Sequence, residues 1–341
     1  MKLIGVALSV GLMFSATGCP NQSLNDSKTA QKAGTTALGQ KQYEGAIEQF
    51  EKATQAYHDN HEAWYYLGGA YLEKGDAGKA VDALEKAVQL VPDNAMYQMW
   101  YDIALYQKAY DQARDEQAHK QNKQPTEVTP DLTGVSFEKA QQSLAEAVKL
   151  APELWRAHQY LGRIYRATDK SKEAADEFSK ALAANPREPT LYVALGELYR
   201  KWDYTDEAIK VASQGTTNVP GANEVSDIYF VLGMGYDDKR MDDKAIESFT
   251  KAIESSKNNH KAQFQRGQAY FRKGDYTDAK RDLEEFNKTG GASLDFAKQQ
   301  ATKMLMDISA KTAPPVDKTA TEKPSPADLV KKPLPPPHPK H

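Results

Sequence analysis

The chain has 341 residues, of which 40% are hydrophobic and 27% charged, and its formal net charge is −3. A nearly neutral charge argues against electrostatic binding to nucleic acid, which requires a strongly basic surface. The single cysteine excludes an internal disulfide and a zinc site built from several thiolates.

The N-terminus contains the only continuously apolar stretch of the sequence. Met1 and Lys2 precede an apolar run from Leu3 to Phe14, and this run is too short to span a bilayer. Residues 1–18 are therefore predicted to be a signal peptide.

Cys19 follows Gly18, and this junction resembles the lipobox of bacterial lipoproteins, with Ala16 where that family usually has Leu. The resemblance implies that Cys19 is lipidated, with diacylglycerol and palmitate-type acyl chains, and that cleavage makes it the first residue. An ordinary cleaved signal peptide with an incidental cysteine and an uncleaved anchor are the alternatives.

A lipid on Cys19 would hold the folded body close to a membrane, because two or more acyl chains anchor a protein stably. Residues 19–26 are the expected tether, and the stretch from Pro20 to Asp26 can extend to about 25 Å at most. Position 20 is not the Asp that favours inner-membrane retention in such lipoproteins. By this analogy we expect an outer-membrane protein that faces the periplasm.

The segment from His61 to Asn94 has the pattern of two short helices. In the first helix, Trp64, Leu67 and Tyr71 recur at i, i+3 and i+7, which places them on one face. Gly75 is expected to end this helix.

A second apolar stripe follows, formed by Ala80, Leu84 and Ala87, and Pro92 cannot continue the helix beyond it. Because Gly68 and Ala80 are small, the two antiparallel helices can approach each other closely. The segment is therefore predicted to form a helix hairpin.

The same pattern recurs along the chain. The small residue of the first helix is found at Gly34, Gly68, Gly162, Gly196, Gly233 and Gly267. The alanine of the second helix is found at Ala46, Ala80, Ala140, Ala174, Ala208, Ala245 and Ala279. Successive alanines stand 34 residues apart, except for gaps of 60 after Ala80 and 37 after Ala208. Asp102 occupies the position at which the third repeat should have its glycine.

This pattern, W-x2-L-G-x2-Y followed by A-x3-F and P, resembles the tetratricopeptide repeat (TPR). The resemblance implies an all-α, right-handed α-solenoid of about seven TPR helix hairpins, since stacked hairpins bury a continuous core that one hairpin cannot bury alone. The repeats are expected at 27–60, 61–94, 95–154, 155–188, 189–222, 226–259 and 260–293.

The C-terminal region divides into two predicted segments. Residues 294–310 are expected to form a capping helix, with Phe296, Met304, Leu305 and Ile308 on the last hairpin. Residues 311–341 contain nine prolines and are predicted to be a disordered Pro-rich tail.

The third repeat carries an insertion at about residues 111–136. Its first helix begins near Ala95 and is expected to stop before Pro125, and Ser136 is the expected N-cap of its second helix. Long insertions in repeat proteins often lie on the binding face. The alternative is a tolerated surface loop.

In TPR proteins the first helices line a concave surface whose outward positions contact peptides, and the resemblance implies the same register here. The apolar candidates are Tyr65, Leu72, Met96, Met99, Ile103 and Tyr106 in repeats two and three, and Phe230, Met234, Phe264 and Phe271 in repeats six and seven. The cationic candidates are Arg156, Arg163, Arg166, Arg200 and Lys201.

Exposed apolar strips and arginines favour a protein partner whose acidic stretch lies over repeats four and five. The alternative is that these residues pack against neighbouring helices or are simply solvated. Gln159 and Arg163 replace the Lys/Asn pair with which chaperone-binding members of the family hold acidic C-termini.

The sequence contains no GxxxxGK[ST], GxSxG, HExxH or CxxC motif, so we expect no catalytic residues, no cofactor and no metal. The predicted function is a lipid-anchored, non-catalytic scaffold that binds a protein partner at the cell envelope, similar in kind to pilotin and assembly-factor lipoproteins. The alternative is a regulatory subunit of a cell-wall or polysaccharide biosynthesis system that binds an anionic polymer or its enzyme.

Overall fold

The computed structural model describes residues 20–221, 223–291 and 294–313, and the regular structure in these ranges is entirely helical. The expected signal peptide, Cys19 and residues 314–341 of the expected tail lie outside the described residues. The described ranges contain fifteen α-helices and one short 3-10 turn.

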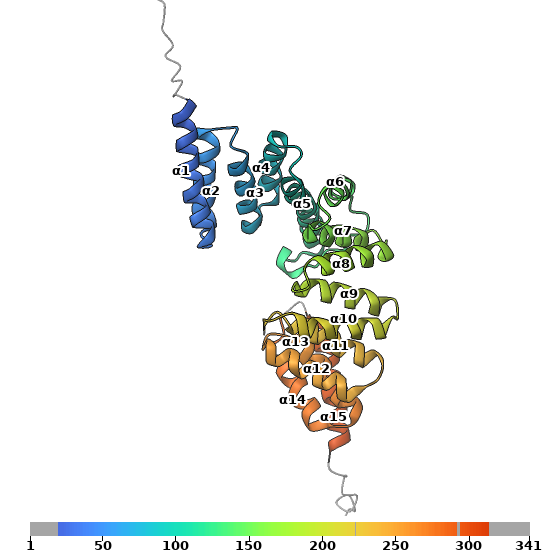
Figure 1. The fold of residues 1–341 in the computed structure, drawn as a ribbon. Helices are drawn as coiled ribbons and strands as arrows, with labels where there is room; N and C mark the ends of the chain where they lie inside the picture. The colour runs from blue at the N-terminus through green and yellow to red at the C-terminus, as the bar shows by residue number, and fades with distance from the viewer. Residues whose placement is uncertain (1–19, 222, 292–293, 314–341) are drawn as a thin grey trace, which may run out of the picture.

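The helices form consecutive antiparallel pairs that stack into an elongated, curved array (Figure 1). The seven pairs are α1 (Pro20–Gly39) with α2 (Tyr43–Ala56), α3 (His61–Lys74) with α4 (Ala77–Leu90), α5 (Ala95–Gln121) with α6 (Glu138–Leu150), α7 (Trp155–Ala167) with α8 (Ser171–Ala184), α9 (Pro189–Lys201) with α10 (Thr205–Asn218), α11 (Ser226–Asp238) with α12 (Asp242–Ser255), and α13 (His260–Lys273) with α14 (Tyr276–Thr289). A last helix, α15 (Asp295–Thr312), follows them. The predicted all-α solenoid of helix hairpins is confirmed.

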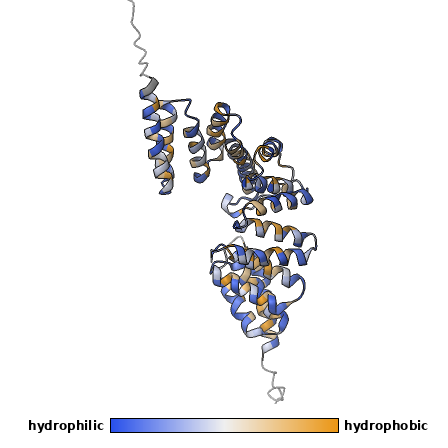
Figure 2. Ribbon diagram, viewed as in Figure 1, coloured by the Kyte–Doolittle hydropathy of each residue, from blue (hydrophilic) through white to orange (hydrophobic). Residues whose placement is uncertain are grey.

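In all hairpins except those of repeats three and five, the glycine of the first helix lies against a large residue of the second. A Cβ added to Gly162 would lie 2.7 Å from the ring of Phe178, and one added to Gly68 would lie 2.3 Å from Leu84. Such distances leave no room for a side chain, so the glycines permit the close packing of each pair. Hydrophobic residues accordingly lie mostly between neighbouring helices (Figure 2).

Gly196 departs from this arrangement. A Cβ on it would lie 2.6 Å from Val231 of α11, in the next repeat, rather than against a side chain of α10. The first helices of repeats five and six therefore approach each other directly at this point.

Except in repeat three, the turn inside each hairpin contains one residue in the left-handed conformation at the same place in the repeat. Gly75 and Gly274 have φ values of 85° and 80°, as expected for glycine. The same conformation is adopted without glycine at Lys41, Asp169, Asp203 and Arg240, with φ between 57° and 61°. A main-chain hydrogen bond across the end of the first helix accompanies this conformation, as between the N–H of Lys170 and the carbonyl oxygen of Tyr165 at 2.8 Å.

The same arrangement of hydrogen bonds occurs at two junctions between repeats. Ser27 in α1 donates to the carbonyl oxygen of Ala53 at 2.7 Å, and the side-chain amide of Asn60, the N-cap of α3, donates to Ser27 at 2.8 Å. Ser226 and Asn259 form the equivalent bonds at the junction of repeats six and seven. The network satisfies buried polar groups where one hairpin meets the next.

Repeat three differs from the others in its core. Asp102, in place of the expected glycine, is fully buried between α5 and α6. The amide of Gln98 donates to its carboxyl oxygens at 3.2 and 3.4 Å. Burial raises the pKa of Asp102 to about 8, although hydrogen bonds with Ser143 and Gln98 act in the opposite direction.

The insertion begins as a continuation of α5, in line with the expectation that this helix stops only before Pro125. The helix runs on to Gln121 and ends at Asn122, whose φ is 52°. The chain then returns along the helix, and Asp131 and Gln117 exchange two hydrogen bonds of 2.6 and 2.8 Å. Ser136 is not the N-cap of α6. Phe137 is, and its buried ring, which stacks on Tyr106 at a centroid distance of 5.1 Å, fixes where the helix begins.

Both ends of the described chain are more helical than expected. Helix α1 starts at Pro20, so residues 20–26 are not an extended tether but the first turns of that helix, which rises only about 1.5 Å per residue. Residues 311 and 312, expected in the tail, belong to α15.

Helix α15 covers the last hairpin through Ala301 and Ile308, which are buried, and through Met304 and Leu305, which are packed against the same cluster. The expectation for Phe296 is wrong, since its side chain is 73% exposed. It precedes the inward-facing Ala297 by one residue and therefore lies about 100° round the helix from it.

Candidate binding groove

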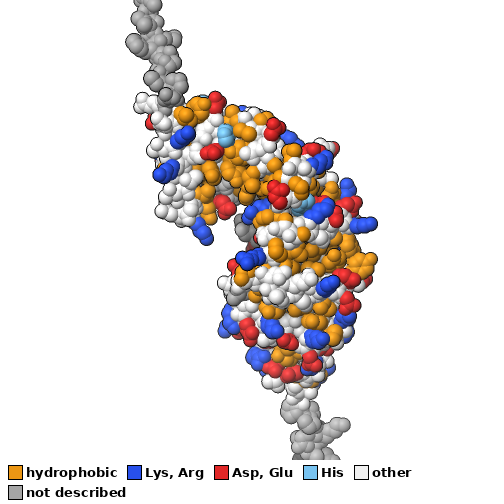
Figure 3. All heavy atoms as spheres, viewed as in Figure 1, with side chains coloured by type: hydrophobic (Ala, Val, Ile, Leu, Met, Phe, Trp, Pro, Cys, Tyr) orange, Lys and Arg blue, Asp and Glu red, His pale blue; other side chains and the backbone are white. Residues whose placement is uncertain are grey.

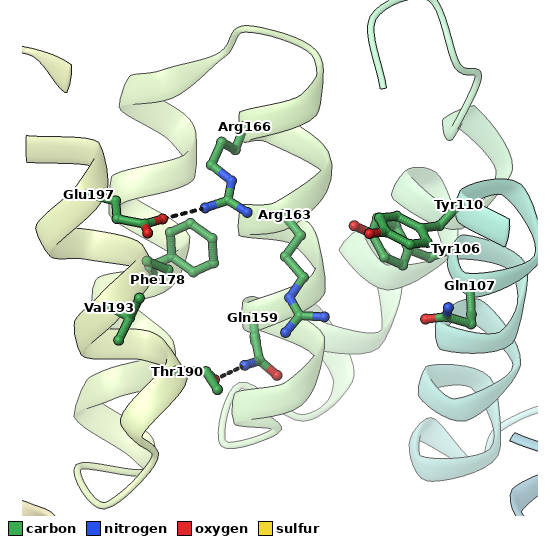
Figure 4. A pocket seen from close by; sticks show the side chains of 11 residues that line it. Tyr106, Gln107, Tyr110, Gln159, Arg163, Arg166, Phe178, Thr190, Val193 and Glu197 are labelled. Carbon is green, nitrogen blue, oxygen red and sulfur yellow. Dashed lines mark hydrogen bonds and ion pairs between the residues drawn. The ribbon is translucent and has the colours of Figure 1, made fainter. Parts of the chain in front are cut away.

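Two adjoining cavities lie along the surface formed by the first helices of repeats two to five. One, of about 300 Å³, is lined by Tyr106, Gln107, Tyr110, Gln159, Arg163, Arg166, Phe178, Thr190, Val193, Ala194 and Glu197. The other, of about 540 Å³, is lined by Leu72, Glu73, Gly75, Trp100, Ile103, Gln107, Asp111, Arg114, Trp155, Arg156, Gln159, Tyr160, Arg163, Glu188 and Thr190. They share Gln107, Gln159, Arg163 and Thr190, so they form one continuous groove. Figure 4 shows the residues that line the smaller cavity.

Two arginines of α7 project into this groove. The guanidinium carbon of Arg156 lies 4.3 Å from the ring centroid of Trp155 and 5.6 Å from that of Trp100. That of Arg163 lies 4.9 Å from the ring of Tyr160. Stacking on aromatic faces restrains both side chains and leaves their N–H groups available at the edges. Neither arginine forms an ion pair or a hydrogen bond with any side chain in the described part of the molecule.

The other three predicted cations are paired with carboxylates of neighbouring repeats. Arg200 makes two hydrogen bonds to Asp238, of 2.6 and 3.0 Å. Arg166 lies 3.6 Å from Glu197, and Lys201 lies 3.7 Å from Asp169. Of the five cations expected in the groove, Arg156 and Arg163 are therefore the two that are not paired with a carboxylate of the described residues.

Several apolar residues predicted to be exposed are buried. These are Met99, Ile103, Tyr106 and Phe264, with exposed fractions of 3 to 6%. Tyr106 is covered by Phe137 and by the edge of Tyr160, and Phe264 packs on Phe286 at a centroid distance of 5.0 Å. They serve the core between helices, and only the faces of Tyr106 and Ile103 that line the cavities reach the groove.

The remaining apolar candidates are more accessible. Met96 is 40% exposed, Leu72 lines the larger cavity, and Tyr65, Phe230, Met234 and Phe271 are half-buried. Phe271 is partly covered from α15, because the ammonium of Lys311 lies 5.3 Å from its ring. Tyr65 in α3 is separated by repeats three to five from Phe230 and Met234 in α11 and from Phe271 in α13, so no single apolar strip joins repeats two and seven.

The polar floor of the groove is a short hydrogen-bonded chain. The amide nitrogen of Gln159 donates to the hydroxyl of Thr190 at 2.7 Å, and Thr190 donates to Glu188 at 2.7 Å. Figure 4 shows Arg163 extending from α7 between Gln159 and Gln107, while Arg166 turns toward Glu197. Repeats three, four and five each contribute a side chain to this part of the surface.

Sequence reasoning missed two residues that matter to the groove. Arg114 lies on the extension of α5 and was not among the predicted groove residues; it is paired with Asp111 at 3.0 Å and Asp115 at 3.3 Å. Trp155, the first residue of α7, was not singled out from the sequence, yet its ring supports Arg156. A Trp-Arg step at a helix start was the available signal for the second case.

Neither a cluster of metal ligands nor a helix able to cross a membrane is present in the described ranges. They contain no group of three or more His, Cys, Asp or Glu side chains arranged to hold a metal ion. Among the helices of these ranges, none combines the length and the apolarity needed to cross a bilayer.

Comparison with known proteins gives consistent matches to one family. A sequence profile of the tetratricopeptide repeat matches residues 32–95, 136–189 and 243–284, and a second matches residues 226–259. Together these ranges cover more than half of the chain. No curated protein matches the whole sequence significantly.

Solved structures with a similar fold share little sequence with this chain. The pilF protein of Pseudomonas aeruginosa is 18% identical, with a TM-score of 0.52 over 69% of this chain and 94% of that one. A tetratricopeptide repeat protein from Parabacteroides merdae is 13% identical, with a TM-score of 0.52 over 83% and 99% of the two chains. The APC/C hetero-tetramer Cut9–Hcn1 is 13% identical, with a TM-score of 0.54 over 84% and 47%. At these identities the likeness concerns the fold alone.

Proposed function

Because the chain belongs to the tetratricopeptide repeat family, whose members generally act as protein-interaction scaffolds, we propose that its groove binds a segment of a partner protein. Members of this fold family are typically non-catalytic. In this proposal the chain positions its partner and transforms no substrate.

One observation carries the proposal: Arg156 and Arg163 are held by aromatic rings in an open groove without a carboxylate partner among the described residues. An arginine that only supports the fold is normally paired, as Arg200 is here. Arginine and aromatic side chains are enriched at the energetically important positions of protein interfaces.

Site-specific crosslinking in cells tests this function. A photoreactive amino acid would replace Gln107 in one variant and Lys288, an exposed residue of α14, in a control variant. We expect the groove variant to yield a discrete adduct with one protein and the control to yield none. Adducts of equal intensity from both positions, or none from the groove, would contradict the proposal.

We further propose that Cys19 carries a lipid and that the scaffold serves an assembly or pilotin-like role at the outer membrane, facing the periplasm. This proposal is supported by the lipobox-like junction before Cys19. Since α1 begins at Pro20, such an anchor would connect to the first helix without an extended tether. The solenoid would then be held near the bilayer.

Fractionation of cells tests the anchor separately from the groove. Cys19→Ala should move the protein from the membrane fraction to the soluble fraction, because the acyl chains supply the membrane affinity. Arg187→Gln, on an exposed turn, serves as the control and should stay in the membrane fraction. Membrane association that survives Cys19→Ala would rule out the lipid anchor and leave the groove proposal intact.

A further inference from the structure

We infer that the groove recognises a protein segment with two acidic residues three positions apart, one carboxylate bound by Arg156 and the other by Arg163. The inference rests on the proposed function of the groove and adds the chemistry and the spacing of the bound segment. It follows from where the two arginines lie, how they are held and what surrounds them.

The positions of the two arginines set a distance. Both belong to α7, seven residues apart, so they lie on the same face of the helix, about 10 Å from each other along its axis. Arg156 lines the larger cavity, and Arg163 lines both. One ligand that runs along the groove can therefore reach both guanidinium groups.

The way in which the arginines are held indicates that they bind a ligand. The rings of Trp155, Trp100 and Tyr160 cover the faces of the guanidinium groups and reduce the side-chain freedom that binding would otherwise remove. The edge N–H groups remain, in the fork geometry that matches a carboxylate. The neighbouring Arg166 differs, because its guanidinium is already paired with Glu197 of the same chain at 3.6 Å. Arg156 and Arg163 have no such carboxylate among the described residues and can pair with one from a ligand.

The same contacts argue for a carboxylate-bearing peptide over a neutral sugar. A sugar would stack on the faces of Trp100 and Trp155, and Arg156 already lies over both rings. Between the two arginines, Gln159 gives its amide N–H to Thr190, and Gln107 gives its own to Asp111 at 3.1 Å. The amide oxygens of both glutamines are left as acceptors, which suits the backbone N–H groups of a peptide.

The distance between the arginines selects the conformation of the segment. In the polyproline II conformation, residues i and i+3 lie on the same side and are separated by about 9 Å. In a β-strand, residues i and i+3 point to opposite sides, and in an α-helix the matching pair would be i and i+7. An α-helix bonds its backbone N–H groups internally and would leave the acceptor oxygens of Gln107 and Gln159 without a donor. We therefore assign the bound segment to the extended polyproline II form with acidic residues at i and i+3.

Fluorescence anisotropy with defined peptides tests the assignment. The probe is a fluorescein-labelled peptide Gly-Pro-Glu-Pro-Pro-Glu-Pro-Gly, added to the full-length protein purified in detergent at low salt. The comparison peptides have both glutamates changed to Gln, one glutamate changed to Gln, the glutamates two residues apart, or two glutamates seven apart in an alanine-rich helix. We expect the probe to bind at least about tenfold more tightly than each comparison peptide.

Variants of the protein identify the carboxylate that each arginine binds. Arg156→Gln and Arg163→Gln should each weaken binding of the probe by about tenfold. Two peptides are compared, each with a different glutamate changed to Gln, and each variant should leave unchanged the affinity for the peptide that lacks the glutamate bound by the mutated arginine. Arg187→Gln removes the same charge from an exposed turn outside both cavities and should change nothing. Thermal unfolding of each variant shows whether a loss of binding reflects a loss of fold.

Three results would overturn the inference. One is tightest binding of the helical peptide, which would replace the extended register. Another is binding of the probe that neither arginine variant weakens. The third is tighter binding of oligogalacturonate, a carboxylated glycan, through the same two arginines. If no peptide binds but crosslinking from Gln107 still captures one protein, the spacing is wrong and the proposed function stands.

Discussion

Repeats five to seven and repeats two to four are built from the same hairpin but joined in different ways. The C-terminal stack, from α9 to α14, is joined across its repeats by ion pairs: Arg200 with Asp238, Lys239 with Asp206, Arg272 with Asp237 and Asp242, and Lys273 with Asp243. In the central wall, from α3 to α8, no ion pair joins repeat two to three or three to four within the described residues. Aromatic packing joins those repeats instead.

The two regions also differ at the surface. Acidic and basic side chains are interspersed over the visible face of the C-terminal stack, whereas hydrophobic side chains gather around α3–α5 (Figure 3). Where charges neutralise each other between repeats, they link neighbouring hairpins. Where arginines rest on aromatic rings without a partner, the surface can accept a ligand. In the proposed function, the same repeat therefore serves as support in one region and as a binding surface in the other.

The largest expected difference concerns pH and the buried carboxyl of the central wall. Since the folded-state pKa of Asp102 is raised to about 8 from 3.8, its contribution is fully favourable below pH 3.8 and is lost as the pH rises toward 8. The free energy of unfolding should fall by up to about 1.4 kcal/mol per pH unit in that window. Asp102→Asn should remove this fall, as measured by urea unfolding between pH 4.5 and 8.5.

The control for this experiment is Asp131→Asn, an exposed carboxyl in the same repeat. Hydrogen bonds from Thr133 lower the pKa of Asp131, so its removal cannot produce the same loss of stability at rising pH. Identical pH profiles for the wild type and Asp102→Asn would contradict a carboxyl that is protonated in the folded state.

The next effect tests the close contact inside the hairpins. Gly162→Val should lower the free energy of unfolding by about 1–3 kcal/mol, because its Cβ would lie 2.7 Å from Phe178. Gly69→Ala is the matched change, since a Cβ there meets nothing within 4 Å and alanine favours a helix by about 1 kcal/mol. Two variants of equal stability in chemical unfolding would show that the packing tolerates a side chain at both positions.

A smaller effect separates the two classes of arginine directly. Arg200→Gln should cost about 0.2–1 kcal/mol of unfolding free energy, and 1 M NaCl should reduce the difference, because its bonds to Asp238 are partly exposed. Arg163→Gln should cost less stability at low salt while losing affinity for the acidic peptide. The opposite outcome, with Arg163 stabilising the fold and Arg200 needed for binding, would reverse the roles of the two regions.

The smallest effect concerns the strained turns that both regions share. Lys41→Gly should raise the free energy of unfolding by up to about 1 kcal/mol, because Lys41 has a φ of 58° that glycine adopts without strain. Gly75→Ala, at the equivalent place with a φ of 85°, should lower it by a similar amount. Thermal unfolding that moved in the same direction for both variants would exclude strain at this position.

Part of the candidate site was predictable from the sequence. The register placed Arg156 and Arg163 on the outward face of the fourth repeat, where they lie. It also grouped them with Arg166, Arg200 and Lys201, since a pattern of residue types does not reveal that Asp238 or Glu197 will reach across from another helix. The exposure of Tyr106 was misjudged because Phe137, which covers it, comes from the far end of the insertion.

By itself, the sequence determined the hairpins, their spacing and their close glycine contacts, because helix periodicity and side-chain size are local properties that recur every 34 residues. The tertiary structure decided which charges are paired and which apolar residues are buried. These features depend on side chains that meet from helices 30 or more residues apart, as Arg200 and Asp238 do. The residue pattern along the chain does not reveal these long-range contacts. In the proposed function, they distinguish a repeat that supports the array from one that binds a ligand.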